Sequence, residues 1–160
     1  MASILETRFV PWPDEAACAA TAAQVATHLA LRDAFIELHG PLGAGKTTFA
    51  RHLLHALGVS GKIKSPSYAL MEPYQAGEAA GGFAIAHFDF YRFDDPQEWE
   101  DAGFREVFAS PGLKLVEWPE KAAELLPRCD LRLEIAPGDS GDARSARFEA
   151  LSARGRELLS

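Results

Sequence analysis

The chain has 160 residues, 48% of them hydrophobic, which is enough apolar material for one compact domain with a buried core. Its formal net charge is −7, with 23 acidic against 16 basic side chains, and this balance argues against tight unaided binding to RNA or DNA. We expect a single domain over residues 1–160. Cys18 and Cys129 are isolated and give neither a disulfide framework nor metal-ligand spacing, so a reducing cytoplasm is the expected location.

The N-terminus and the longest Ala-rich stretch both lack the pattern of a targeting or membrane segment. Residues 1–8 show no cationic start followed by an apolar run, so a secretory signal is not expected. Residues 16–31 are interrupted by polar side chains and are too polar to span a bilayer. We therefore expect a soluble protein.

The first elements are predicted to be a strand and a helix. Residues 4–10 can form an edge strand, which Pro11 and Pro13 are expected to end. Asp14 then offers an N-cap for a helix that is predicted to run to about Leu31. Because this helix is mostly alanine, its packing face is expected to be narrow.

A phosphate-binding unit follows. Residues 34–38 form an apolar strand, and residues 40–47 read GPLGAGKT, which fits the phosphate-loop pattern G-x-x-x-x-G-K-[ST]. Glycines in such a turn let backbone N–H groups point at phosphate oxygens, and the following helix N-terminus favours the same anion. We expect Lys46 to reach the β- and γ-phosphates and the Thr47 hydroxyl to hold a magnesium ion, so the sequence predicts a nucleoside triphosphate site.

The segment after the loop is predicted to contain a helix, a loop and a hairpin. The helix begins near Lys46 and ends at Gly58, with apolar side chains at core-facing spacing. Residues 62–68 contain a proline and several hydroxyls, which disfavour helix, and they lie where many nucleotide-switch loops occur. Residues 68–74 and 83–90 are predicted to pair as a hairpin.

Short helices and strands are predicted to alternate in the C-terminal half. A helix with proline in its first turn is expected from residue 94 through Trp99 and is stopped by Gly103. The elements predicted after it are a turn at 104–108, a buried strand at 113–117, a helix from Pro119 to about Leu126, strands at 131–135 and 146–151, and a helix at 153–159. The whole pattern predicts an α/β fold, a P-loop NTPase-like sheet with helices on both faces in three layers.

Two acidic residues follow predicted strands and are candidate partners of the loop. In open α/β sheets ligands bind beyond the carboxyl ends of the strands, so Asp89 and Glu117 can face the same crevice as Thr47 if their strands are neighbours. The residues alone do not say which carboxylate serves magnesium. Trp118 is either a half-buried core residue or a ring near the nucleotide, and His87 on an apolar strand is expected to be a core histidine rather than a ligand.

Four motifs occur together along the chain. They are GPLGAGKTT at 40–48, KSPSY at 64–68, HFDFYR at 87–92 and EWPE at 117–120. This combination resembles the TsaE family, formerly YjeE, the small ATPase of bacterial tRNA threonylcarbamoyladenosine synthesis. The similarity extends from residue 11 to about Arg147. The phosphate loop is shared by many families, whereas the other three motifs together are close to diagnostic.

The resemblance implies a role for each matching residue. Lys46, Asp89 and Glu117 would act in catalysis, with Asp89 resembling a Walker B aspartate. Thr47, Asp89 and Glu117 would hold magnesium. The nucleotide would be bound by Glu15, Leu42, Gly43, Ala44, Gly45, Lys46, Thr47, Thr48, Ser67 and Trp118.

The same resemblance implies cofactors and partners. ATP and Mg²⁺ would be the cofactors, and TsaB and TsaD the protein partners. With a separately made threonylcarbamoyl-adenylate, these partners modify adenosine 37 of tRNAs that read ANN codons. The TsaE member would support repeated turnover by binding and hydrolysing ATP without transferring the carbamoyl group, and tRNA would be held mainly by the partners.

Three positions depart from the family pattern. Pro41 stands where Asp is common, at a position that contributes backbone to the loop. Ser67 replaces Thr, which keeps the hydroxyl and loses the methyl that restrains its rotamer. Asp142 follows Gly141 where the family shows Gly-Arg, which puts any nucleotide contact from that turn in doubt.

The implied reaction is in-line attack of water on the γ-phosphate, and two rivals use the same loop. Arg92 is the candidate for an arginine that stabilises charge in the transition state, and hydrolysis is expected to be slow alone and stimulated by partners. A small-molecule kinase would need an acceptor pocket and usually a lid, and no insertion of that length is apparent. A GTP-dependent switch is disfavoured because the sequence has no N-K-x-D motif.

Overall fold

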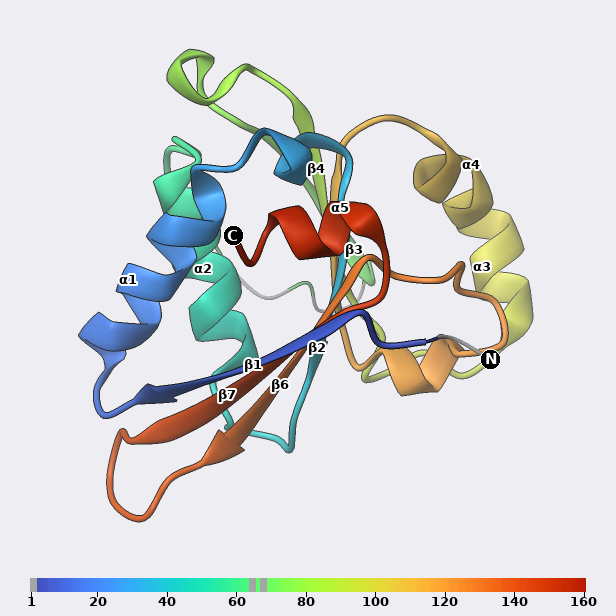
Figure 1. Cartoon of the computed structure of the whole chain (residues 1–160). Helices are drawn as coiled ribbons and strands as arrows, with labels where there is room; N and C mark the ends of the chain where they lie inside the picture. The colour runs from blue at the N-terminus through green and yellow to red at the C-terminus, as the bar shows by residue number, and fades with distance from the viewer. Residues whose placement is uncertain (1–2, 64–65, 67–68) are drawn as a thin grey trace.

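A computed structural model describes residues 3–63, 66 and 69–160 (Figure 1). Within these residues, seven strands form one sheet in the order β1-β7-β6-β2-β5-β4-β3. The strands are β1 (Glu6–Trp12), β2 (Phe35–His39), β3 (Met71–Gln75), β4 (Ala84–Asp89), β5 (Leu113–Glu117), β6 (Leu131–Pro137) and β7 (Arg144–Ala150). The helices are α1 (Glu15–Ala26), α2 (Lys46–Ala56), α3 (Pro96–Ala102), α4 (Phe104–Ala109) and α5 (Ala153–Glu157), and the 3₁₀ helices are η1 (Leu29–Asp33), η2 (Glu78–Ala80) and η3 (Pro119–Ala122).

The sheet is mixed, with its parallel part at the centre. β2 pairs in parallel with β5 and with β6, and β4 pairs in parallel with β5. The pairs β1–β7, β6–β7 and β3–β4 are antiparallel, and the last of these is the predicted hairpin. The carboxyl ends of β2, β5 and β4 therefore lie side by side at one edge of the sheet, where α/β folds bind ligands.

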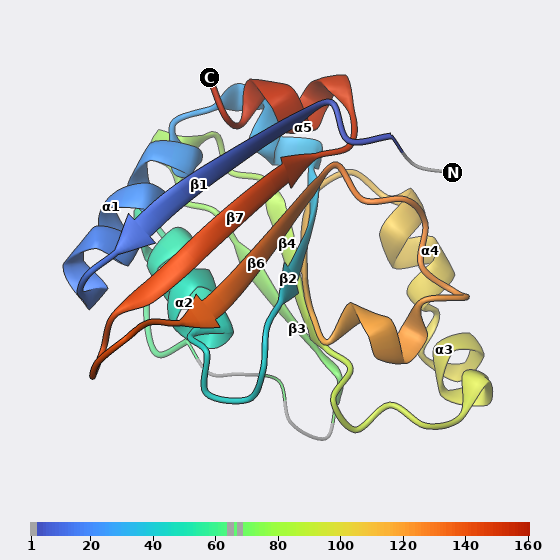
Figure 2. The same cartoon turned by 60° about the horizontal axis from the view of Figure 1, so that its bottom comes forward.

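Helices cover both faces of the sheet, which confirms the predicted three-layer α/β fold. α1 and α2 lie together on one side, and α3 and α4 lie on the other (Figures 1 and 2). Alternate residues of β5 enter two separate cores: Leu113 and Leu115 pack with α2, whereas Val116 packs with Trp99 and Phe104 of α3 and α4. The alternation arises because successive side chains of a strand point to opposite faces.

β1 is an edge strand, as predicted, and it extends further than expected. The strand continues through Pro11 to Trp12, and Pro11 is aligned with Ser145 of β7. A proline lacks the N–H that a central strand would need, but an edge strand has a side without a partner strand and tolerates it. The longer strand carries the Trp12 side chain into the core, where it is 1% exposed.

α1 begins as predicted and ends early. The Asp14 carboxylate caps the helix by accepting a hydrogen bond of 2.9 Å from the Ala17 N–H. The helix ends at Ala26 because His28 adopts an extended conformation (φ −87°, ψ 131°) and turns the chain into η1. The turn brings Leu31 into the core, so burial of one apolar side chain outweighs continuation of an alanine helix.

The predicted helix from Pro119 to about Leu126 is reduced to the four residues of η3. Trp118, directly before it, has a left-handed backbone (φ 56°), and the Lys121 N–H donates to the Trp118 carbonyl in a 3₁₀ turn. This turn buries Ala122 against the second core, and no regular α ladder follows. The turn predicted at 104–108 is instead the helix α4.

The described residues contain no helix that is long and apolar enough to cross a membrane. Cys18 and Cys129 are buried free thiols, in agreement with the expectation that they form no disulfide. Burial raises the pKa of Cys18 to about 11 and that of Cys129 to about 12, so both thiols are protonated at neutral pH.

Candidate functional site

The phosphate loop connects β2 to α2 through left-handed backbone at its glycines. The φ angle is 148° at Gly40, 79° at Gly43 and 108° at Gly45, a region that residues with a Cβ rarely adopt. A Cβ on Gly40 would also lie 2.4 Å from the carbonyl oxygen of Ile135 on β6. The loop thus has its shape because glycine stands at these positions, and it ends at the first N–H groups of α2, which lack helical partners.

The first turn of α2 is hydrogen-bonded to the end of β5. The Thr47 hydroxyl donates to Glu117 Oε1 at 2.8 Å and lies 3.1 Å from Oε2. Asp89, the last residue of β4, is aligned with Glu117 in the parallel pairing of β4 and β5. The neighbouring strands therefore bring both predicted carboxylates to one place beside Thr47.

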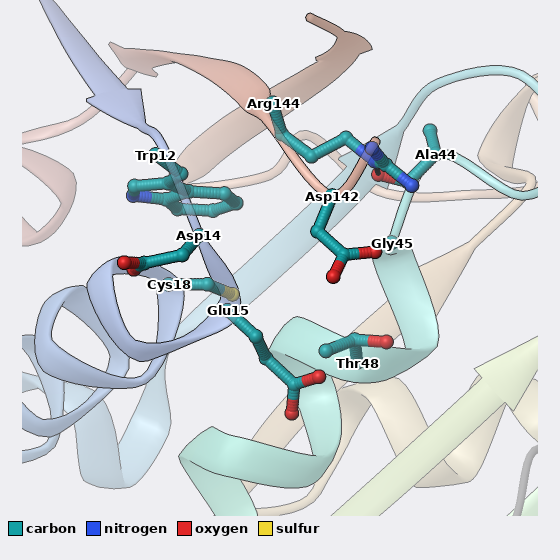
Figure 3. Close-up of a pocket in the computed structure, with 9 residues that line it drawn as sticks. All are labelled: Trp12, Asp14, Glu15, Cys18, Ala44, Gly45, Thr48, Asp142 and Arg144. Carbon is teal, nitrogen blue, oxygen red and sulfur yellow. Dashed lines mark hydrogen bonds between the residues drawn. The ribbon is translucent and has the colours of Figure 1, made fainter. Parts of the chain in front are cut away.

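Two adjacent pockets contain the predicted nucleotide-binding, metal-binding and catalytic residues that the structure describes, apart from Arg92. The first is lined by Leu42, Gly43, Gly45, Lys46, Thr47, Thr48, Asp89, Glu117, Trp118 and Arg144. The second, shown in Figure 3, is lined by Trp12, Asp14, Glu15, Cys18, Ala44, Gly45, Thr48, Asp142 and Arg144. Because Gly45, Thr48 and Arg144 line both, the two pockets adjoin one another at the start of α2.

The second pocket is assembled from three separate parts of the chain. Trp12 and Glu15 come from the end of β1 and the start of α1, Thr48 from α2 and Asp142 from the β6–β7 turn (Figure 3). Trp12 is held in place because its indole N–H donates to the Thr21 hydroxyl at 2.9 Å. The pocket combines this fixed aromatic wall with the carboxylates of Glu15 and Asp142, which are hydrogen-bond acceptors.

Lys46 lies folded against its own loop. Its ammonium donates to the Gly40 carbonyl at 2.5 Å and lies 3.4 Å from the centroid of the Trp118 ring, within reach of a cation–π interaction. Burial lowers the pKa of Lys46, and the carboxylates of Glu117, Glu120 and Asp89 oppose that shift. Trp118 is half-buried, contacts the Tyr91 ring at 5.0 Å between centroids and lines the first pocket, so it is both a packing residue and a pocket residue.

Sequence reasoning did not identify Arg144 as a site residue. Its Nε donates to the Ala44 carbonyl at 2.8 Å and its Nη2 to the Gly43 carbonyl at 3.4 Å, which ties the β6–β7 turn to the phosphate loop. The family resemblance points only to position 142, directly after Gly141, where this chain has Asp. The signal that could have found Arg144 was a basic residue three positions after Gly141, at the start of β7.

Ser67 and Arg92 are predicted site residues that have not been placed in either pocket. Ser67 lies outside the described residues, so its place in the site stays a prediction. Arg92 is exposed and is not among the described residues that line the two pockets. The role of Arg92 in stabilising charge in the transition state therefore stays a prediction.

The oxygen atoms around Thr47 suit Mg²⁺, which in nucleotide sites is held by one or two carboxylates together with phosphates and water. Thr47 offers a hydroxyl, and Asp89 and Glu117 offer two carboxylates. Among the described residues, no group of three or more His, Cys, Asp and Glu could hold a metal ion. These donors therefore suit a Mg²⁺ ion that is bound jointly by the protein and by the phosphates of a ligand, and not an ion that is bound by protein side chains alone.

Comparison with known proteins identifies the family. A family model described as "Threonylcarbamoyl adenosine biosynthesis protein TsaE" matches residues 12–146. The chain is 40% identical over 125 residues to the tRNA threonylcarbamoyladenosine biosynthesis protein TsaE of Haemophilus influenzae, covering 78% of this chain and 75% of that protein. It is 37% identical over 120 residues to the protein of the same name from Bacillus subtilis, covering 74% and 71%.

A solved structure agrees with this match along the whole chain. The crystal structure of Bacillus subtilis YdiB is similar with a TM-score of 0.78 and 26% sequence identity, over 99% of this chain and 95% of that chain. The family match includes the phosphate loop, both carboxylates and the two pockets. The chain therefore belongs to the TsaE family.

Proposed function

We propose that this protein binds ATP together with Mg²⁺ and hydrolyses it slowly, in support of threonylcarbamoyladenosine biosynthesis on tRNA. The observation that carries the proposal is the hydrogen bond of 2.8 Å between Thr47 and Glu117, with Asp89 on the neighbouring strand and Lys46 in the same pocket. A phosphate loop alone accounts for triphosphate binding. Hydrolysis also needs a carboxylate near the metal and a group that orients water, and this arrangement offers both.

Some site residues bind the phosphates, and others position the metal ion and the attacking water. The loop and Lys46 hold the phosphates, with the ammonium turning from the Gly40 carbonyl to the β- and γ-phosphate oxygens. Thr47 and Asp89 would hold Mg²⁺, which when bound neutralises phosphate charge. Glu117 orients the attacking water or supports the metal. Catalysis of this kind consists of positioning and charge stabilisation in a prearranged site.

The second pocket supports ATP as the nucleotide. It adjoins the first pocket at Gly45 and Thr48 and is not lined by Glu117, and the base of a bound nucleotide would lie there. The carboxylates of Glu15 and Asp142 can accept hydrogen bonds from the exocyclic amino group of adenine. The carbonyl that guanine carries at the same ring position is itself an acceptor and would be disfavoured.

The proposed biological role follows the family. With TsaB and TsaD as partners, the protein would use ATP hydrolysis to allow repeated threonylcarbamoylation of adenosine 37 in tRNAs reading ANN codons. The relatives from Haemophilus influenzae and Bacillus subtilis are named as tRNA threonylcarbamoyladenosine biosynthesis proteins, which supports this role. The net charge of −7 supports tRNA being held mainly by the partners.

The test follows phosphate released from labelled ATP or GTP with Mg²⁺, with and without TsaB and TsaD. We expect slow release from ATP, stimulation by the partners and little release from GTP. Lys46→Ala should abolish ATP binding or hydrolysis, whereas Arg105→Ala, an exposed change on α4, should match the unsubstituted protein. Full hydrolysis by the Lys46 variant would contradict the assignment of the site, and phosphate transfer to an added metabolite would favour a kinase.

A further inference from the structure

His87 lies in the middle of the sheet and contacts the candidate site from behind. It is on β4, between Leu115 of β5 and Glu72 of β3 in the strand pairings, and it is 0% exposed. Its Nε2 lies 2.7 Å from Glu117 Oε2. His87 does not line either pocket as described, so it reaches the site only through Glu117.

The hydrogen bond has a defined direction. An ionised carboxylate only accepts hydrogen bonds, so the N–H at His87 Nε2 donates to Glu117. Glu117 is 2% exposed, and a carboxylate removed from water in this way needs donors from the protein. His87 is therefore a core histidine, as the sequence suggested, and its Nε2 has a hydrogen-bond partner. That partner, Glu117, belongs to the candidate site.

The Glu117 carboxylate is held from two sides. Thr47 donates to Oε1 at 2.8 Å from α2, and His87 contacts Oε2 at 2.7 Å from β4. With Thr47 as the only donor, rotation about the terminal torsion of Glu117 would be restrained by a single contact. With both donors, the plane of the carboxylate is set by two elements of the fold.

A buried histidine is energetically unfavourable at this place in the sheet. Its other ring nitrogen, Nδ1, is buried and has no hydrogen-bond partner among the described residues. A phenylalanine would place a somewhat larger ring there without leaving a polar atom unpaired, and an apolar residue would be favoured if packing alone mattered. The contact with Glu117 is what the histidine provides and phenylalanine cannot.

We propose that His87 is a positioning residue for ATP hydrolysis, which acts by fixing the orientation of the Glu117 carboxylate toward Thr47. This inference rests on the proposed ATPase function. Loss of a partner of this kind around a catalytic group or metal site typically reduces activity by about 10- to 100-fold. The hydrogen bond of His87 is made with Glu117 and not with the phosphate loop or Lys46, so metal-free nucleotide binding should be unaffected.

The test compares three substitutions of His87 that differ in where they place a donor. His87→Phe keeps a ring and removes the donor. His87→Gln places its amide nitrogen near the position of Nε2, and His87→Asn places it near Nδ1, away from Glu117. We expect kcat for ATP to fall about 10- to 100-fold in the Phe and Asn variants and to recover substantially in the Gln variant. Affinity for ATP without Mg²⁺ should stay within about twofold in all three.

A second readout does not depend on activity. In nucleotide-free crystal structures, we expect the Thr47–Glu117 hydrogen bond to be kept in the Gln variant and lost or lengthened in the Phe variant. If the unsubstituted protein hydrolyses no ATP, the proposed function fails, and the crystal structures alone then decide the role of His87. If the unsubstituted protein is active and the Phe variant keeps its kcat, or the Gln and Asn variants behave alike, the inference on His87 fails by itself.

Discussion

The Thr47 hydroxyl and the Glu117 carboxylate, 70 residues apart in the sequence, are joined by a hydrogen bond of 2.8 Å. This contact links the first turn of α2 to the end of β5. Because the hydroxyl proton is directed at the carboxylate, the lone pairs of Thr47 Oγ1 stay available for a metal ion. One residue pair thus prepares both the metal position and the carboxylate next to it.

Glu117→Gln should separate hydrolysis from nucleotide binding. The amide is similar in size but is neutral and has only one acceptor oxygen, so it cannot orient water or receive both Thr47 and His87 as the carboxylate does. We expect kcat to fall by about 100-fold or more, with ATP affinity changed only a few-fold. Phosphate release and the fluorescence of Trp118 measure the two quantities. Glu124→Gln, an exposed change, serves as the control, and an unchanged kcat for Glu117→Gln would remove Glu117 from the mechanism.

Elements with strong local signals could be predicted from the sequence. β5 has its predicted limits, residues 113–117, because a largely apolar run, LKLVE, lies between a glycine and a Trp-Pro pair. The end of α3 at Gly103 follows from the left-handed backbone (φ 69°) that glycine accepts there. The phosphate loop and α2 are equally local, since the motif itself specifies the turn and the helix start.

Features that depend on how distant segments pack could not be predicted in this way. The end of α1 is decided by burial of Leu31 after a turn, which no residue in the helix encodes. The contact of His87 with Glu117 depends on the parallel pairing of β4 and β5, and that of Arg144 on the place of a hairpin near the loop. Strand order decides these contacts, and one sequence does not reveal strand order.

Arg144→Ala should weaken both the fold and ATP binding. The guanidinium holds the carbonyls of Ala44 and Gly43, and its loss frees the β6–β7 turn from the phosphate loop. We expect the free energy of unfolding to fall by about 1–2 kcal/mol and the KM for ATP to rise more than kcat falls. Arg144→Lys should not restore the effect, because an ammonium lacks the planar fork that spans two carbonyls.

Chemical denaturation and steady-state kinetics measure these changes, with Arg156→Ala as the control because Arg156 is exposed on α5. An Arg144→Ala variant with unchanged stability and unchanged KM would show that the turn is not a part of the nucleotide site.

Gly40→Ala should damage the loop through a steric clash. The added Cβ would meet the Ile135 carbonyl oxygen at 2.4 Å, and backbone on a neighbouring central strand cannot move away cheaply. Gly82→Ala is the matched control, because Gly82 also has a positive φ (61°) but has nothing within 4 Å of the built Cβ. We expect the control to lose about 1–2 kcal/mol of unfolding free energy from backbone strain alone, and Gly40→Ala to lose clearly more, together with ATP binding. Equal losses in the two variants, measured by urea denaturation, would show that the approach to Ile135 does not constrain the loop.

Cys129 should make the protein less stable as the pH rises above about 9. Burial raises the pKa of this thiol from 9.0 to about 12, so above pH 9.0 the unfolded chain loses the thiol proton while the folded chain keeps it. The unfolded state then binds fewer protons, and the unfolding free energy falls with rising pH by up to about 1.4 kcal/mol per unit until the folded thiol also ionises. Cys129→Ala removes this titration and leaves a pH-independent packing loss. The test is urea denaturation of both proteins at several pH values between about 8 and 10.5. We expect a constant difference in unfolding free energy at the lower pH values, and a steeper fall of the unfolding free energy of the unsubstituted protein above about pH 9. Parallel curves throughout would show that Cys129 titrates normally in the fold.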